Sequence, residues 1–181
     1  LLRGGEIELP KYRMVSIKEF ISYVKDTGWY SYDIETNREL DFTKEGSFIT
    51  VISGHTVFKG QNICFSRRCP QQSECDDLFL LFSMRNATIV GHNLKFDLAW
   101  TKAKLGVMPL NKVFDTQIAY AVLVNEEASS SLKTLAYQFT DFGGYEHSMK
   151  SLDKDIPNGY SYDAYTSMPE DYKRTLEEYN R

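Results

Sequence analysis

The first clear pattern along the chain is an apolar stripe with helical spacing. Four apolar residues recur at intervals of three and four positions: Ile17, Phe20, Ile21 and Val24. Ser16 precedes this stripe and Gly28 follows it. Because serine is a favourable N-cap and glycine a favourable C-terminal stop, the pattern predicts a helix between them. Residues 1–14 carry few structural signals, and we expect them to form an N-terminal arm.

Segments rich in aromatic and β-branched residues predict strands after this helix. Residues 29–35, which read WYSYDIE, have the composition of a strand. Further extended segments are predicted at 47–53, 56–66, 88–91 and 113–114. A turn is expected at residues 59–62, where the sequence reads KGQN.

The remaining apolar patterns predict helices. These are expected at residues 74–85, 94–105, 117–124 and 131–140, and from near residue 167 to the end of the chain. Residues 141–168, which hold Gly, Pro, Ser, Asn and several tyrosines, are expected to form a long surface excursion. Early strands followed by strand–helix alternation predict an α/β domain with a mixed sheet flanked by helices.

Composition and charge narrow the classes of function. The chain has 181 residues, enough for one domain, and 42% of them are hydrophobic. No apolar run approaches membrane-spanning length, so no membrane partner is expected. An odd number of cysteines, 3 in all, argues against a disulfide framework and for a reducing compartment. The net charge of −4 disfavours loose polyanion binding, but not an enzyme whose carboxylates hold divalent cations.

Two clusters of carboxylates are candidates for such chemistry. Asp33 and Glu35 are two positions apart in a predicted strand and so point to the same face. Adjacent like charges are unfavourable unless a cation lies between them, and Mg²⁺ prefers oxygen ligands. Asp97 lies in the first turns of a predicted helix among apolar neighbours. A solvated strand end and a helix N-terminal carboxylate are the structural alternatives for these acids.

Four sequence segments together resemble one family. They are Asp-Ile-Glu-Thr at 33–36, Gly-His-Asn-Leu-Lys-Phe-Asp-Leu-Ala at 91–99, Phe-Asp-Thr-Gln-Ile-Ala at 114–119 and Ser-Leu-Lys-Thr-Leu-Ala at 131–136. The chain resembles the proofreading 3′-5′ exonuclease domain of family A DNA polymerases. This resemblance implies a ribonuclease H-like fold with a five-stranded sheet, in which three antiparallel strands precede shorter parallel ones. It also implies that residues 15–181 form the exonuclease domain. Because the first residue is Leu1, we expect the chain to be a piece of a longer polymerase.

The resemblance also implies roles for individual residues. Two divalent cations, Mg²⁺ or Mn²⁺, would be held by three carboxylates: Asp33, Glu35 and Asp97. Thr36, through its backbone, and Asn93 would contact the terminal nucleotide. Tyr179 would orient the attacking water.

The family places an aspartate four residues after that tyrosine, and here this position falls beyond Arg181. The complete Tyr-x-x-x-Asp motif in the sequence, Tyr137 to Asp141, comes earlier and is the alternative third motif. Its position just before Gly143 makes it the second choice.

The implied reaction is hydrolysis of the last phosphodiester of a single-stranded DNA 3′ end, releasing a nucleoside monophosphate. A polymerase domain C-terminal to this one is the expected partner, in the cytoplasm of a bacterial cell or phage-infected host. Two alternatives remain open at this point. One is an RNA 3′ exonuclease of the ribonuclease D type, and the other is an inactive domain that holds single strands or supports a polymerase.

Overall fold

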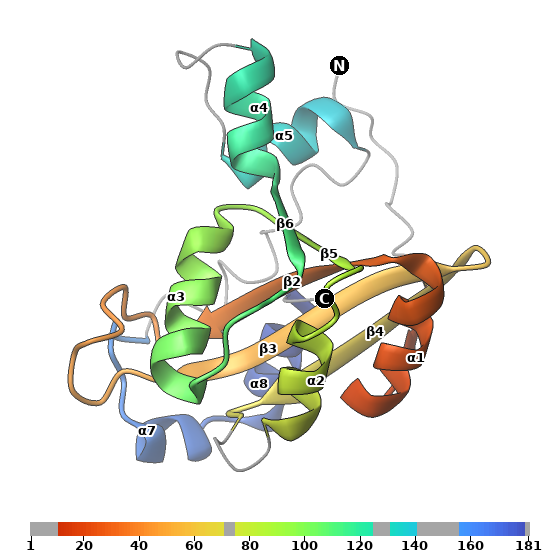
Figure 1. The fold of residues 1–181 in the computed structure, drawn as a ribbon. Helices are drawn as coiled ribbons and strands as arrows, with labels where there is room; N and C mark the ends of the chain where they lie inside the picture. Colours follow the sequence, from red (N-terminus) through yellow and green to blue (C-terminus); the bar gives the residue numbers. More distant parts are fainter. Residues whose placement is uncertain (1–10, 71–74, 125–130, 141–155, 180–181) are drawn as a thin grey trace.

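The computed structural model describes residues 11–70, 75–124, 131–140 and 156–179, with side chains through Leu176 in the last range (Figure 1). Its strands are β1 (Tyr12–Met14), β2 (Trp29–Thr36), β3 (Ile49–Phe58), β4 (Gln61–Arg68), β5 (Thr88–Gly91) and β6 (Lys112–Asp115). Its helices are α1 (Ile17–Thr27), α2 (Asp76–Phe82), α3 (Leu94–Leu105), α4 (Thr116–Val124), α5 (Leu132–Phe139), α7 (Tyr162–Thr166) and α8 (Glu170–Tyr179).

The strands form one mixed sheet in the order β1-β4-β3-β2-β5-β6. Strands β2, β3 and β4 are antiparallel, whereas β5 and β6 are added in parallel. The predicted α/β class and strand directions are therefore confirmed. The expected count of five strands is one too few, because Tyr12–Met14 pairs in parallel with Asn62–Cys64 of β4. This short edge strand forms by backbone pairing with a segment far away in the sequence. The residues of the expected N-terminal arm carry no local pattern that indicates this pairing.

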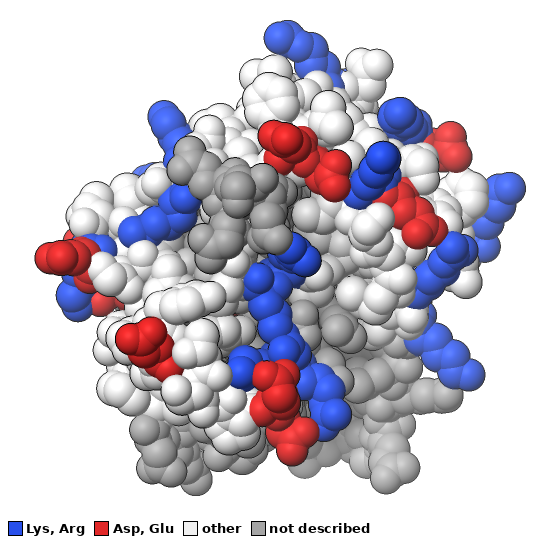
Figure 2. Space-filling view, turned by 90° about the horizontal axis from the view of Figure 1, so that it is seen from below, with Lys and Arg blue, Asp and Glu red and all other residues white. Residues whose placement is uncertain are grey.

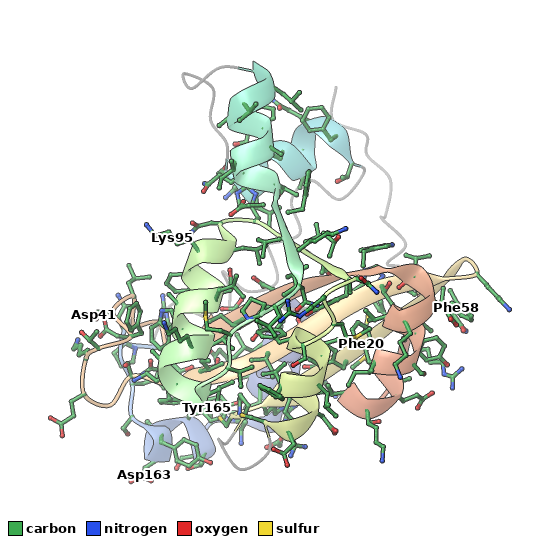
Figure 3. All side chains as sticks on the ribbon, viewed as in Figure 1. Phe20, Asp41, Phe58, Lys95, Asp163 and Tyr165 are labelled. Atoms are coloured by element: carbon green, nitrogen blue, oxygen red, sulfur yellow. The ribbon has the colours of Figure 1, made fainter. Side chains whose placement is uncertain are left out.

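Helices cover both faces of the sheet (Figure 1). One core lies between the sheet and α1, α2 and α3, and includes the fully buried Phe20, labelled in Figure 3. A second cluster lies on the opposite face, where Val51 of β3 meets the tyrosine-rich α7–α8 segment. Side chains alternate along each strand, so β2 directs Tyr30, Tyr32 and Ile34 to the first core. The intervening Asp33 and Glu35 therefore point away from it.

The first helix forms where the apolar stripe predicts it. The Oγ atom of Ser16 accepts a hydrogen bond from the backbone N–H of Glu19 at 3.1 Å, which caps α1. Gly28 ends the helix in the left-handed conformation with φ of 74°.

Strand β3 is continuous where the sequence predicts a break. Residues 54–55, expected between two strands, pair with both β2 and β4. Gly54 is needed here for close packing: a Cβ atom would lie 2.9 Å from the carbonyl oxygen of Ser31 and would collide with the ring of Phe65. The hairpin turn follows at Lys59 and Gly60, within the expected range.

Helices α4 and α5 project away from the sheet, and neither contains a buried residue (Figure 1). Three apolar side chains of α4 are largely exposed: Ile118, Val122 and Leu123. None of the helices in the described ranges is both long and apolar enough to span a membrane.

The surface excursion was expected at residues 141–168, and the structure describes residues 156–168 of this range. Residues 141–155 lie outside the described residues. The prediction is wrong for part of the remainder, because Ser161 caps α7 through a 3.1 Å bond to the N–H of Ala164, and Tyr165 of that helix is buried. Seen from below, acidic and basic side chains are interspersed on this face of the domain (Figure 2).

Candidate active site

The site begins where β5 stops and β2 continues with β3 as its remaining neighbour. Within β2, the residues that pair with β5 are Trp29–Ser31, the first part of the strand. Beyond that point α3 replaces it, and Oδ1 of Asp97 accepts the backbone N–H of Ile34 at 3.2 Å. The Asp97 carboxylate thus takes the place that a carbonyl of a neighbouring strand would occupy. Asp97 is only 4% exposed, so its position is tightly defined.

The Asp33 and Asp97 carboxylates meet at this point. They lie close enough for the charge of Asp33 to act on Asp97. Desolvation by the surrounding protein raises the pKa of Asp33, although the residue is exposed at the surface. Burial raises the pKa of Asp97 as well, and the charge of Asp33 raises it further. The pair therefore resists carrying two negative charges without a cation.

Glu35 contributes to this site as a nearby charge. Its effect is a smaller rise in the pKa of Asp97. Among the residues that the structure describes, no three His, Cys, Asp or Glu side chains lie close enough together to hold a metal ion. The geometry therefore unites Asp33 and Asp97 and leaves Glu35 outside a three-ligand group. Two adjacent carboxylates still suit Mg²⁺, which binds through one or two carboxylates and retains several waters.

The turn between β5 and α3 is tight and conformationally demanding. A Cβ atom on Gly91 would lie 2.7 Å from Cγ of Leu94 and 3.0 Å from the carbonyl oxygen of Tyr32, so only glycine fits. Asn93, the predicted nucleotide contact, is exposed and adopts the left-handed conformation with φ of 59° and ψ of 40°. An asparagine accepts this conformation more readily than most residues.

Asp115 is a further residue of this region, for which the sequence alone predicted no role. It ends β6, and its carboxylate accepts the backbone N–H groups of Asn93, Leu94 and Gln117 at 3.0, 2.8 and 2.9 Å. One signal could have found it, because an aspartate between a strand and a helix is a typical N-cap. The bonds to residues 93 and 94 are long-range and leave no such local signal.

The loop that follows β2 is stabilised by hydrogen bonds that begin at Thr36 and Asn37. The Thr36 hydroxyl donates to the carbonyl oxygen of Glu39 at 2.9 Å, which leaves the backbone of Thr36 as its predicted nucleotide contact. Asn37 is buried, and its Nδ2 donates to the carbonyl oxygens of Gly46 at 3.2 Å and Tyr160 at 2.8 Å. This side chain joins the loop to the segment that precedes α7. It was missed because a loop asparagine carries no specific local signal.

The residues of the predicted third motif are less completely described. Tyr179 is the last residue of α8, and its side chain lies outside the described residues. Two residues of the same predicted stripe, Tyr172 and Leu176, are buried against the sheet as expected. In the alternative motif, Tyr137 is 62% exposed on α5, and Asp141 lies outside the described residues.

Comparison with known families agrees with this architecture. The sequence model of a family described as 3′-5′ exonuclease, the exonuclease of family A DNA polymerases, matches residues 14–159. The chain belongs to this 3′-5′ exonuclease family. The match covers the carboxylate-bearing segments of the exonuclease domain and ends before α8.

Relatives of the exonuclease domain include two phage DNA polymerases. It is 27% identical over 145 residues to the DNA polymerase of Escherichia phage T5, covering 76% of this chain and 16% of that protein. It is 31% identical over 91 residues to the DNA polymerase of Bacillus phage SP01, covering 50% of this chain and 10% of that protein. The exonuclease domain thus spans a small part of each polymerase.

Solved structures share the fold of the exonuclease domain at low sequence identity. Escherichia coli RNase D, an exoribonuclease, superposes with a TM-score of 0.61 at 12% identity, covering 93% of this chain and 41% of that one. Brucella melitensis NrnC with bound Mg²⁺ superposes with a TM-score of 0.50 at 15% identity, covering 93% and 88%. The ribonuclease H-like fold expected from the sequence is confirmed.

Proposed function

We propose that this exonuclease domain hydrolyses the terminal phosphodiester of single-stranded DNA from its 3′ end and proofreads for a DNA polymerase. The observation that carries the proposal is the proximity of Asp97 to Asp33, the exposed residue of β2. Such a pair concentrates negative charge beside open solvent, where divalent cations and a nucleic-acid phosphate can meet.

Asp33 and Asp97 are the proposed metal-holding residues, with Glu35 as the third carboxylate. Divalent ions at this position supply activation of the attacking water and stabilisation of the leaving 3′ oxygen. The bond from Ile34 to Asp97 keeps one carboxylate oxygen directed into the sheet and leaves the other for a ligand. Tyr179 is proposed to orient the water. The Thr36 backbone and Asn93 are proposed to hold the terminal nucleotide.

The proposed partner is a polymerase domain in the same polypeptide. Support comes from the phage relatives, which are DNA polymerases and extend far beyond the matched region. Proofreading requires tolerance of every base, and contacts to backbone phosphate and sugar provide it because they carry no direct sequence information. An intracellular location, in a bacterial cell or phage-infected host, is part of the same proposal.

RNA is the competing substrate. The similarity to Escherichia coli RNase D favours this candidate, although at 12% identity it bears on the fold alone. Discrimination between the sugars depends on contacts near the terminal 2′ position.

A direct assay compares the two substrates. Single-stranded DNA and RNA oligonucleotides of matched sequence, labelled at the 5′ end, are incubated with the chain in Mg²⁺ or Mn²⁺. We expect a descending ladder from DNA that EDTA abolishes and that the Asp97→Asn variant does not produce. Because the family places an aspartate beyond Arg181, the assay includes a version carrying any native residues that follow.

Each outcome has a distinct meaning. Faster degradation of RNA than of DNA would replace the proposed substrate with the alternative. A ladder that survives both EDTA and the Asp97→Asn substitution would exclude the proposed site. Binding of single strands without cleavage by either version would support the inactive-domain alternative.

A further inference from the structure

Helix α3, which carries Asp97, is attached to the sheet on both sides of β5. On the β2 side, Asp97 itself accepts the N–H of Ile34 at 3.2 Å. On the β6 side, Asp115 accepts the N–H groups of Asn93 and Leu94, the residues that start the helix. Because β2 and β6 flank β5 in the sheet, these bonds hold the first turn of α3 from opposite directions.

The attachment on the β6 side involves more than one residue. The Thr116 hydroxyl donates to the carbonyl oxygen of Gly91 at 3.0 Å. His92 Nδ1 lies 3.0 Å from the same hydroxyl oxygen. Since that hydroxyl proton is already donated to Gly91, the imidazole Nδ1–H is the donor in this second bond. Every residue of the β5–α3 turn is thus bonded to Asp115 or Thr116.

The bonds to Asp115 act on a conformation that needs support. Asn93 occupies the left-handed region, which is less favourable for a side-chain-bearing residue and persists where surrounding bonds enforce it. The N–H groups of the first turn also have no partners within the helix itself. Asp115 stabilises the left-handed conformation of Asn93 and accepts N–H groups at the start of α3. Its effect is larger than that of a neutral acceptor, because hydrogen bonds to an ionised carboxylate are stronger than neutral ones.

We propose that Asp115 is a positioning residue of the active site, which fixes the first turn of α3 and thereby the placement of Asp97 and Asn93. This inference rests on the proposed function for its catalytic consequence. Asp115 is not itself proposed as a metal ligand, because three backbone N–H groups already occupy its oxygens. It contacts the start of α3, about one turn of helix before Asp97.

Substitutions at Asp115 separate this role from ordinary capping of α4. Serine is as good an N-cap as aspartate and can still accept the N–H of Gln117, but it has no second oxygen for the α3 turn. Asparagine retains one carbonyl oxygen in the position of Oδ1, which serves Asn93 and Gln117. If Asp115 positions α3, asparagine should preserve more function than serine; if it only caps α4, both should behave like wild type.

The experiment measures three quantities in the wild type, Asp115→Asn, Asp115→Ser and the control Asp26→Ser on the exposed end of α1. These are the amide hydrogen exchange of residues 93 and 94, the Mn²⁺ dissociation constant by calorimetry, and kcat on a DNA oligonucleotide. For Asp115→Ser we expect faster exchange at both amides. We also expect Mn²⁺ binding weaker by about tenfold and kcat lower by about 10- to 100-fold, since supporting residues and small misplacements have effects of this size. Asp115→Asn should lie between, and Asp26→Ser should match wild type.

Wild-type values of Mn²⁺ affinity and kcat in Asp115→Ser would overturn the inference, as would unchanged exchange at residues 93 and 94. A wild-type chain that binds Mn²⁺ but cleaves no nucleic acid would refute the proposed function alone. The order of Mn²⁺ affinities and exchange rates would then still decide the role of Asp115. Absence of Mn²⁺ binding in the wild type would refute both.

Discussion

Ile34 of β2 donates its backbone N–H to the carboxylate of Asp97 on α3, although 63 positions separate the two residues in the chain. The bond places the side chain of Asp97 next to that of Asp33, the neighbour of Ile34 in the strand. It also explains how a carboxylate at 4% exposure is tolerated, since one of its oxygens has a backbone donor. The proposed site is thus built on the sheet itself.

Substitution of Asp97 by asparagine should abolish cleavage and leave the fold intact. The amide oxygen of asparagine can still accept the N–H of Ile34, whereas the negative charge is lost. We expect single-turnover cleavage of labelled DNA in Mg²⁺ to fall by at least about a hundredfold, since charge stabilisation by a metal contributes several kcal/mol and each 1.36 kcal/mol is tenfold in rate. The control is Asp163→Asn on α7, which should retain wild-type activity. Wild-type rates in Asp97→Asn would remove Asp97 from the mechanism.

The metal-free domain should lose stability as pH rises. Burial raises the pKa values of Asp33 and Asp97 in the folded state, and the charge of Asp33 raises that of Asp97 further, to about 8. The native state then binds more protons than the unfolded chain, whose aspartates titrate near pH 4. Stability from this source is complete below about pH 4 and is lost as pH rises toward 8. Thermal unfolding in EDTA should show a midpoint lower at pH 8 than at pH 5 by a few degrees.

Divalent cations should reverse this trend, because they bind the deprotonated pair. The increase in unfolding midpoint on adding Mg²⁺ should therefore be larger at pH 8 than at pH 5. The Asp97→Asn variant lacks one titrating partner and should show a weaker dependence on both pH and Mg²⁺. An equal Mg²⁺ effect at the two pH values would contradict a metal site at this pair.

Lys95 should contact the substrate backbone. It is exposed in the first turn of α3, two positions from Asp97, and projects to solvent (Figure 3). Lys95→Ala should raise KM for single-stranded DNA several-fold and reduce the slope of log KM against log salt by about 0.7, the loss of one phosphate contact. Lys102→Ala is a matched control, because this exposed lysine lies on the same side of α3 but two turns further from the site. Equal effects of the two substitutions would indicate non-specific attraction.

Removal of a single hydroxyl group tests the two candidates for the third motif. Tyr179→Phe should lower kcat by about a hundredfold, the lower end of the range for a group acting on the attacking water, with little change in Mn²⁺ affinity. Tyr137→Phe on α5 should leave both quantities unchanged. The reverse result would assign the third motif to Tyr137 and Asp141.

Local patterns were sufficient to predict much of this fold. The apolar stripe between Ser16 and Gly28 forms α1 with both caps as expected. The short apolar run at Thr88–Gly91 forms β5, and α3 follows directly. These elements are determined by residues close in sequence, and their side-chain periodicity reports which face is buried.

Features determined by distant residues were not predictable in the same way. Strand β1 exists through its pairing with β4, and the break expected near Gly54 is absent because that glycine serves packing between strands. The proximity of Asp33 and Asp97 was predicted from the family resemblance and not from a local residue pattern. The supporting bonds made by Asp115 and Asn37 involve partners far along the chain, and no spacing rule indicates them.

The hydrogen bonds of Asn37 fix where the loop after β2 starts and ends. Its backbone N–H and side-chain oxygen both bond to Phe48, at 3.1 and 3.3 Å, and its Nδ2 reaches Gly46. These bonds hold the two ends of residues 38–45 together. Exchanges of exposed side chains within this segment, such as Leu40, should therefore change the surface that follows β2 without shifting the strand.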